Sequence, residues 1–300
     1  MLLAYDRGTI IARGTSISPT PHFKWDPRAE VFRALACRYR EVVEYLESRG
    51  IEFKDAVLDP VEGELKVVKR ISLRTYQREA LKAWLSKKRG VVVLPTGAGK
   101  TRVALAAMAE LRCPTLVVVP TLELMDQWEG KISRYFSTDI GRFGGGDREI
   151  GFVTIATYDS AYLNAELLGN KFALVVFDEV HHLPSPGYRQ IAELSAAPYR
   201  MGLTSTPERE DGAHELLPDL VGPIVYEKRA RELAGRYLAD FDVVTVRVRL
   251  SREERERYRK ALETYRKYSR KAGIRIRSLE DFQKLIVKSG LNKHAREAIL

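Results

Sequence analysis

The sequence is poor in cysteine and contains no long apolar run. It has 300 residues and two cysteines, Cys37 and Cys113, with no histidines near them at metal-site spacing. This favours a reducing compartment and a fold without disulfides or a structural metal. The longest apolar stretches, such as residues 172–177, fall far short of the roughly 18 residues of a membrane span. The first residues lack the basic and apolar regions of a signal peptide, so we expect a cytoplasmic location.

The chain carries an excess of positive charge that is unevenly distributed. Lys and Arg number 50 against 40 Asp and Glu, a net charge of +10, and 45% of residues are hydrophobic. This balance is that of a globular protein of about two domains, and it excludes whole-chain disorder. The first 246 residues hold 33 basic and 33 acidic residues, whereas the last 54 hold 17 and 7. The whole excess therefore follows position 246 and suggests that a polyanion binds there.

The hydrophobic patterns predict three parts, at 1–70, 71–241 and 242–300. The first is a small α+β domain with a strand over 2–11, a helix over 33–49 and a strand-like segment over 51–69. The second part opens with a helix over 76–88, ended by Gly90, and continues with strands alternating with helices. Its apolar strand runs lie at 91–94, 115–119, 152–156, 172–177 and 200–204. Continuous apolar strands separated by helices predict an α/β fold with a parallel sheet covered on both faces.

The third part is expected to be mostly helical and basic. A helix is expected at 227–238 just before it, followed by an alternating strand at 242–250. A charged helix should run from Ser251, its N-cap, to about Lys271, with Gly273 as its end. Further helices are expected at 281–287 and 293–300.

The strongest chemical signal is LPTGAGKT, at Leu94–Thr101, between a predicted strand and helix. Its glycines let backbone N–H groups face a phosphate chain, Lys100 supplies positive charge, and the Thr101 hydroxyl can ligate Mg²⁺. Leu94 stands where the general pattern has Gly or Ala, which matters little because the turn depends on the later glycines. A chance match is the alternative. The loop predicts an ATP-binding site formed by Thr96, Gly97, Ala98, Gly99, Lys100 and Thr101.

A second signal is FALVVFDEVHH, in which an apolar strand ends in Asp178 and Glu179. Open α/β sheets bind ligands at the carboxyl ends of their strands. Asp178 is expected to hold Mg²⁺, and Glu179 to polarise the attacking water as catalytic base. Because no third metal ligand lies nearby, a hydrogen bond beside the nucleotide suits His181, and packing or surface exposure suits His182.

Two further groups have plain structural alternatives. Thr204, Ser205 and Thr206 follow a strand and could couple the acidic motif to the rest of the site, or could merely cap a turn. Residues 208–211 (ERED) could equally be a solvated turn. The Gln77 amide could read the edge of adenine, although considered alone it fits the surface of a helix.

In this order the motifs resemble those of superfamily 2 helicases, and more closely those of the archaeal XPB group. The resemblance extends from Asp178 to Asp211, and the opening segment (YDRGTI, FKWD, YREVVEYLESRGI) resembles the group's damage-recognition domain. It implies a RecA-like lobe that hydrolyses ATP with Mg²⁺, in a nucleoid-associated DNA repair or transcription enzyme. It also implies DNA contacts at Pro120, Thr121, Thr157, Arg209, Glu210, Asp211, Arg266, Lys267 and Arg270, the last three in a basic thumb.

Such enzymes hydrolyse ATP between two lobes, and the second lobe supplies arginines. None of the four glutamines begins the Gln-x-x-Gly-Arg-x-x-Arg pattern of that lobe. We therefore expect an N-terminal portion of a longer helicase or a split subunit, which binds ATP and duplex, forked or damaged DNA with little turnover. Its expected partners are the second lobe and a nuclease or another repair or transcription protein. Tyr258, Tyr265 and Tyr268 could stack on bases or pack against another helix.

Two other functions remain open from the sequence. One is a non-catalytic scaffold that binds ATP or DNA for a partner such as a nuclease. The other is a restriction-type DNA translocase, which shares the phosphate loop and the acidic motif but leaves Arg209–Asp211 unexplained. DNA-stimulated ATPase activity separates the enzyme from the scaffold.

Overall fold

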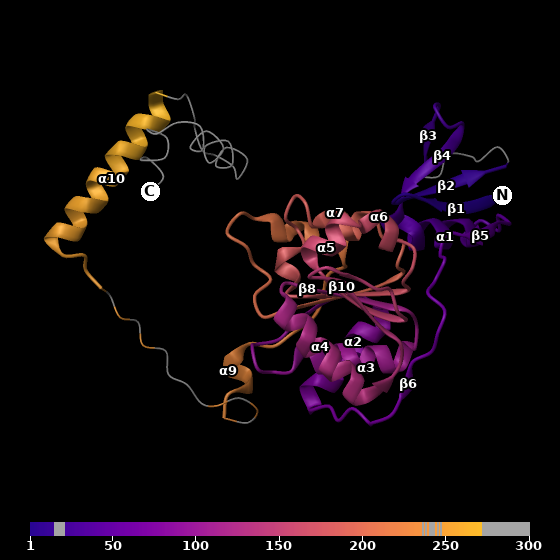
Figure 1. The fold of residues 1–300 in the computed structure, drawn as a ribbon, viewed down its shortest axis with the longest axis horizontal. Helices are drawn as coiled ribbons and strands as arrows, with labels where there is room; N and C mark the ends of the chain where they lie inside the picture. The colour runs from indigo at the N-terminus through magenta and orange to yellow at the C-terminus, as the bar shows by residue number, and fades with distance from the viewer. Residues whose placement is uncertain are drawn as a thin grey trace. The chain divides into compact units, whose positions relative to one another are not determined.

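The computed structural model describes residues 1–14, 22–235, 237, 239, 244, 246 and 248–271 (Figure 1). Its contacts divide the chain into two units, Met1–Asp240 and Phe241–Leu300, which we describe separately. The first unit contains a small N-terminal sheet and a larger central sheet. None of the helices in the described part of the chain is long and apolar enough to cross a membrane.

The N-terminal sheet has the strand order β3-β4-β2-β1-β5. The single strand expected at 2–11 is wrong, because Arg7 and Gly8 adopt φ of 43° and 85° and form a two-residue hairpin turn. The helix expected at 33–49 begins later, because its first residues pair with β2 in the sheet. The elements are β1 Leu2–Asp6, β2 Thr9–Arg13, β3 Lys24–Asp26, β4 Val31–Leu35, a 3-10 turn Ala36–Arg38, α1 Tyr39–Ser48 and β5 Lys54–Ala56.

The central sheet has the strand order β11-β10-β12-β8-β13-β14-β7-β15, and all pairs except β10–β11 are parallel. Every residue of β8, β12 and β13 is buried. This confirms the predicted α/β class. The strands are β7 Arg89–Val93, β8 Thr115–Val119, β10 Ile140–Gly144, β11 Asp147–Arg148, β12 Val153–Thr157, β13 Leu174–Asp178, β14 Tyr199–Thr204 and β15 Ile224–Glu227.

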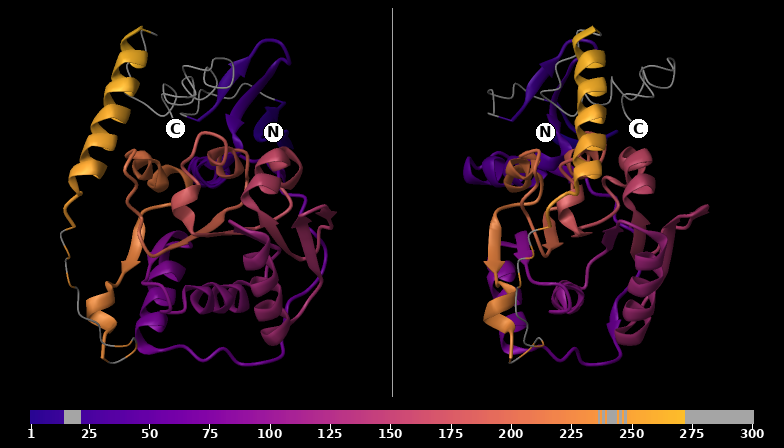
Figure 2. Two further views of the ribbon diagram at one scale, coloured as in Figure 1. Left: turned by 60° about the vertical axis from the view of Figure 1, so that its left-hand side comes forward. Right: turned by 90° about the vertical axis from the view of Figure 1, so that its left-hand side faces the viewer.

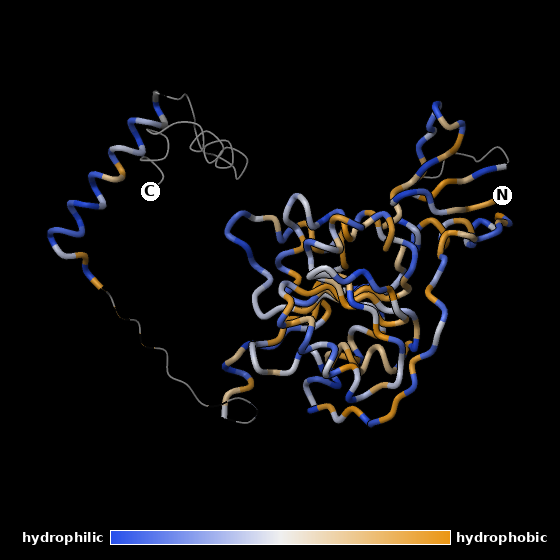
Figure 3. Tube along the Cα trace, in the orientation of Figure 1, coloured by the Kyte–Doolittle hydropathy of each residue, from blue (hydrophilic) through white to orange (hydrophobic). Residues whose placement is uncertain are grey.

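Helices cover both faces of the central sheet, as Figures 1 and 2 show. One apolar layer lies under α2, α3 and α4, and the other under the helices from α5 to α8. The hydrophobic residues gather in the strands of the central sheet, between the two layers of helices (Figure 3). The helices are α2 Thr75–Lys87, α3 Lys100–Leu111, α4 Leu122–Tyr135, α5 Tyr158–Leu163, α6 Ala165–Leu168, α7 Arg189–Glu193 and α8 Leu217–Leu220, with 3-10 turns at Val180–His182 and Ala213–Leu216.

Several expected boundaries in this region are wrong. Helix α2 ends at Lys88, which adopts the left-handed conformation, whereas Gly90 lies inside β7. A Cβ atom at Gly90 would lie only 2.4 Å from Val225 Cγ1, so a side chain has no room there. Strands β10, β11 and β15 were not expected. The helix expected at 227–238 is reduced to α9, Ala230–Leu233. The segment expected as a strand at 51–69 contains β5 and the short β6 Lys66–Val67, which pairs with β9 Phe136–Ser137.

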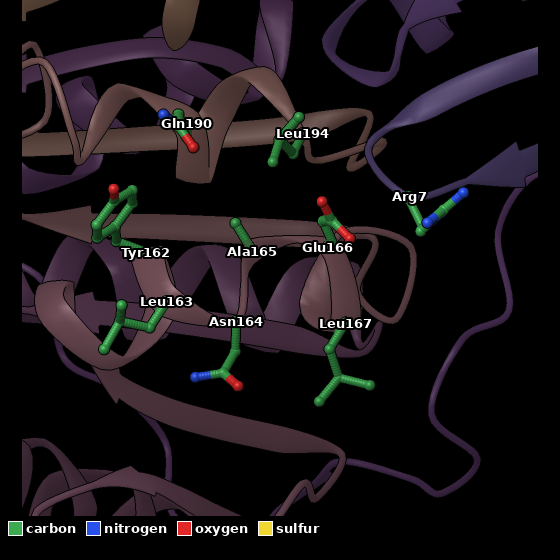
Figure 4. A pocket seen from close by; sticks show the side chains of 9 residues that line it. All are labelled: Arg7, Tyr162, Leu163, Asn164, Ala165, Glu166, Leu167, Gln190 and Leu194. Carbon is green, nitrogen blue, oxygen red and sulfur yellow. The ribbon is translucent and has the colours of Figure 1, made fainter.

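The two sheets of the first unit are joined by close contacts. The Tyr5 hydroxyl lies 3.0 Å from the carbonyl oxygens of both Glu166 and Leu194. The Asn170 amide donates to the Val57 carbonyl at 3.1 Å. Figure 4 shows the neighbouring cleft of about 540 Å³, where Arg7 of the hairpin turn approaches α6 and α7. The N-terminal domain is therefore packed against α6, the residues that directly follow it, and the end of α7.

The second unit contains α10, Arg252–Lys271. Ser251 caps it as expected: its hydroxyl accepts from the Glu254 N–H at 3.2 Å, and its own N–H donates to the Glu254 carboxylate at 2.8 Å. The strand expected at 242–250 is wrong for its described residues, which are in no strand, since no described strand pairs with them. Gly273 and the helices expected at 281–287 and 293–300 lie outside the described residues.

Candidate active site

The carboxyl edge of the central sheet brings together most of the residues predicted from the sequence. In spatial order, β12, β8, β13, β14 and β7 end beside one another because they are parallel. These ends deliver Thr157, Thr121, Asp178, Thr204 and the loop Leu94–Thr101. Strand β14 separates the phosphate loop from Asp178, so Thr204 lies between them. This is the edge at which ligands bind in open α/β sheets.

The loop at Leu94–Thr101 has the backbone of a phosphate cradle. Gly97 and Gly99 adopt φ of 79° and 80°, a conformation that other residues rarely take. The Leu94 N–H donates to the Thr204 carbonyl at 3.0 Å, which fixes the loop to β14. Lys100 and Thr101 open α3, so the free N–H groups of its first turn face the loop. An anionic phosphate is stabilised in such a position.

Gln77 is buried, at 2% exposure, so the surface alternative is wrong. Its Nε2 donates to the Ala98 carbonyl at 2.8 Å, and its Oε1 accepts from the Arg74 N–H at 2.9 Å. The Tyr76 hydroxyl donates to the same Ala98 carbonyl at 2.7 Å. Two neighbouring side chains of α2 thus hold the phosphate loop from behind. Adenine recognition by Gln77 stays a prediction.

Asp178 is a buried carboxylate with both oxygens hydrogen-bonded. Its Oδ2 accepts from the Trp128 indole N–H at 2.8 Å, and its Oδ1 accepts from the Glu179 N–H at 3.1 Å. Burial raises the pKa of Asp178 and the Glu179 charge adds to this, whereas the Trp128 hydrogen bond and Lys100 lower it. The Tyr158 hydroxyl donates to the Asp178 carbonyl at 3.1 Å, which fixes the main chain as well.

Lys100, Glu179 and His181 form a cluster of charged and polar groups at the site. The Lys100 Nζ lies 3.5 Å from Glu179 Oε1, and His181 Nδ1 lies 3.5 Å from Glu179 Oε2. Glu179 adopts φ of 48°, an uncommon conformation for a side chain-bearing residue. Burial lowers the pKa of His181, and the nearby positive groups, among them Arg209 and Lys100, lower it further. Both effects favour the neutral form of His181.

Thr204 connects the acidic motif to the following loop. Its Oγ1 lies 3.2 Å from His181 Nδ1, donates to the Thr206 carbonyl at 3.0 Å and accepts from the Thr206 N–H at 3.2 Å. The hydroxyl thus stabilises the turn and also contacts the acidic motif, and the coupling role stays a prediction. Ser205 and Thr206 line a cleft of about 430 Å³ together with Pro95 and Thr96 of the phosphate loop.

Arg209 and Asp211 form more contacts than a solvated turn would need. The Arg209 guanidinium binds Asp211 through two hydrogen bonds, of 2.9 and 2.7 Å, and donates to the His181 carbonyl at 2.7 Å. The guanidinium holds the pKa of Asp211 well below its usual range. Glu210 between them is exposed. This turn is therefore attached to the acidic motif, which the sequence pattern alone did not indicate.

Of the six residues expected to contact DNA within the first unit, Pro120, Thr121 and Thr157 lie together, where β8 and β12 end. Thr121 caps α4 by accepting from the Leu124 N–H, and Thr157 caps α5 by accepting from the Ser160 N–H, both at 3.3 Å. Pro120 directly precedes Thr121. Two helix N-termini thus lie on adjacent strands, an arrangement that suits phosphate groups. Arg266, Lys267 and Arg270 lie in the other unit, on α10.

Two residues that contact the site were not predicted as site residues from the sequence. Trp128 and Lys131 lie one turn apart on α4, and the Lys131 Nζ lies 3.3 Å from Thr101 Oγ1. Trp128 appears in the sequence only as a member of an apolar stripe with Met125 and Ile132. A buried tryptophan needs a partner for its N–H, and that need was the available signal.

The side chains at the site suit a Mg²⁺ ion that is held in part by nucleotide phosphates and water, rather than a metal held by protein side chains alone. A threonine hydroxyl and one buried carboxylate are the oxygen ligands that Mg²⁺ accepts when nucleotide phosphates and water supply the rest. The described residues contain no cluster of three or more His, Cys, Asp or Glu side chains that could hold a metal alone.

Two protein families match the first unit of the chain. Residues 3–57 match the family described as the Xeroderma pigmentosum group B helicase damage recognition domain, and residues 70–209 match the type III restriction enzyme res subunit. The DNA 3'-5' translocase XPB2 of Sulfurisphaera tokodaii is 46% identical over 99% of this chain and 67% of its own length. The chain belongs to the XPB family of superfamily 2 helicases and translocases.

Other relatives match over shorter segments. The DNA 3'-5' helicase XPB of Mycobacterium tuberculosis is 37% identical over 76% of this chain and 42% of its own length. That of Kineococcus radiotolerans is 40% identical over 62% and 36%. The chain thus spans about two fifths of these two relatives. The damage-recognition match at 3–57 separates it from restriction-type translocases and confirms the predicted XPB resemblance.

Proposed function

We propose that the chain is the nucleotide-binding, DNA-contacting part of an ATP-dependent XPB-type DNA translocase that acts in repair or transcription-linked DNA opening. The observation that carries this proposal is the contact between the phosphate loop and the acidic motif. The Lys100 Nζ lies 3.5 Å from Glu179 Oε1, and Asp178 directly precedes Glu179. In the proposal the loop binds the ATP phosphates. Thr101 and Asp178 would hold Mg²⁺, which neutralises phosphate charge when bound. Glu179 orients the attacking water and accepts its proton.

The division at residues 70 and 241 belongs to this proposal. The damage-recognition-like part is 1–70, the RecA-like lobe is 71–241, and the basic thumb is 242–300. DNA backbone would lie across Pro120, Thr121 and Thr157, and along α10. Catalytic arginines would come from a second lobe, so we expect nucleotide binding but little turnover from the 300 residues alone. No feature of the described residues favours a nuclease partner, and the scaffold alternative stays a prediction.

The test is nucleotide binding and ATPase activity of the chain and of Lys100→Ala. We expect the wild-type chain to bind a fluorescent ATP analogue and Lys100→Ala to bind it on the order of 100-fold more weakly, since a charge-assisted phosphate contact is lost. DNA binding should be unchanged. Equal nucleotide affinity of the two proteins would overturn the loop assignment, and robust DNA-stimulated turnover would overturn the need for a second lobe.

A further inference from the structure

Helix α4 contacts both side chains that the proposed function assigns to Mg²⁺. Trp128 donates to Asp178 Oδ2 at 2.8 Å, and Lys131, one turn further along, lies 3.3 Å from Thr101 Oγ1. Asp178 belongs to the end of β13, and Thr101 belongs to the first turn of α3. One helix therefore reaches two separate elements of the site.

The Trp128 side chain is held rigidly. It is fully buried in the apolar layer between α4 and the sheet, packed with Met125 and Ile132 of its own helix. Its indole has one donor, and that donor is directed at Asp178. The second Asp178 oxygen accepts from the Glu179 N–H, so the carboxylate plane is fixed from two sides. A metal-binding carboxylate is held in this way by hydrogen bonds from behind.

Trp84 shows what a purely structural tryptophan looks like in the same sheet. It too is fully buried, and its indole N–H donates at 2.9 Å to the main-chain carbonyl of Arg200, at the amino half of β14. The burial and the hydrogen-bond length match those of Trp128. The difference lies in the acceptor, which is a main-chain carbonyl for Trp84 and the candidate metal-binding carboxylate for Trp128.

We propose that Trp128 is a positioning residue, whose indole N–H orients the Asp178 carboxylate so that it can bind Mg²⁺. The inference rests on the proposed function, because it assigns Asp178 to the metal. Trp128 acts only through Asp178 and touches no reacting atom. Its loss therefore changes how much Mg²⁺ the site requires rather than whether the phosphate loop binds nucleotide.

The first test is a Mg²⁺ titration of ATP-analogue binding to the full 300-residue chain, comparing Trp128→Phe with Trp84→Phe. Both substitutions remove one buried indole N–H and the same volume. We expect Trp128→Phe to raise the Mg²⁺ concentration for half-maximal binding roughly tenfold, and Trp84→Phe to leave it unchanged. Equal Mg²⁺ requirements in wild type and Trp128→Phe, or the same rise in both variants, would overturn the proposal.

The second test does not require Trp128→Phe to fold. A ¹⁵N-labelled chain has three tryptophans and so three indole N–H signals, which Trp25→Phe and Trp84→Phe assign by elimination. With ADP present, Mg²⁺ should move the Trp128 signal and leave the Trp84 signal in place. An unmoved Trp128 signal would refute the inference while nucleotide binding still upholds the function. A wild-type chain that binds no nucleotide would instead refute the function.

Discussion

Arginine occurs in two opposite settings in this chain, the central sheet and α10. Arg200 at the start of β14 is 1% exposed, and its guanidinium donates to the carbonyls of Ala197, Ser195 and Leu220 at 3.2, 2.6 and 2.6 Å. Helix α10 has nine Lys and Arg residues, and the eight from Arg252 to Arg270 are exposed. The Arg259 side chain, for example, is 68% exposed and pairs with Glu256 at 3.6 Å.

The difference separates two uses of positive charge. A buried guanidinium must have its donors satisfied, so its position is specific and each contact matters for folding. Exposed cations on a helix stabilise the fold little, and they act together on a polyanion in a salt-dependent way. The net charge of +10 reflects the second use alone, because the first 246 residues are balanced.

The largest expected effect is on stability. Arg200→Met removes the donor from three buried carbonyls, and we expect a loss of about 3 kcal/mol in the free energy of unfolding. For a domain of this size, that lowers the melting temperature by roughly 6–12 °C. Arg266→Met on α10 is the matched control and should change stability by less than about 0.5 kcal/mol. Similar melting temperatures for both variants would remove the distinction drawn above.

The next effect concerns DNA. Deleting the residues after Asp242 removes the basic segment, and we expect most of the salt-dependent affinity for duplex DNA to disappear while ATP-analogue binding is kept. The measurement is the slope of log affinity against log salt concentration. Arg266→Ala alone should reduce that slope by about one. If affinity survives the deletion, the edge at Thr121 and Thr157 is the main DNA contact.

The candidate nucleotide site was easier to find in the sequence than the rest of the fold because its motifs are local, and its role stays a prediction. The loop at Leu94–Thr101 and the strand ending in Asp178 are read from consecutive residues, and the parallel sheet brings them together. The contacts of Trp128 and Arg209 were harder to predict, because each side chain binds a partner that is distant in sequence. Trp128 binds the Asp178 carboxylate, and Arg209 binds the His181 carbonyl.

The misplaced elements have physical causes of the same kind. The hairpin turn at Arg7 and Gly8 depends on two positive φ angles within an otherwise continuous strand pattern. Strand β10 contains two glycines, and a backbone hydrogen-bonded to β12 stabilises it against its weak propensity. The alternating residues from Val244 to Leu250 fit a strand in pattern, but a strand forms only beside another strand, and the described chain provides none there.

The smallest effect expected is a pH dependence of stability at the turn that follows the acidic motif. Because Arg209 lowers the pKa of Asp211 in the folded chain, the folded state binds fewer protons than the unfolded state as the pH falls below about 4. The stabilisation is therefore complete above that pH and is lost progressively below it. Asp211→Asn should lower the melting temperature by about 1 °C at pH 7, and the difference from wild type should shrink toward pH 3. Glu210→Gln, at the exposed neighbouring carboxylate, should show no such difference at either pH. A difference for Asp211→Asn that stays constant from pH 7 to pH 3 would mean that the Arg209–Asp211 pair is not its source.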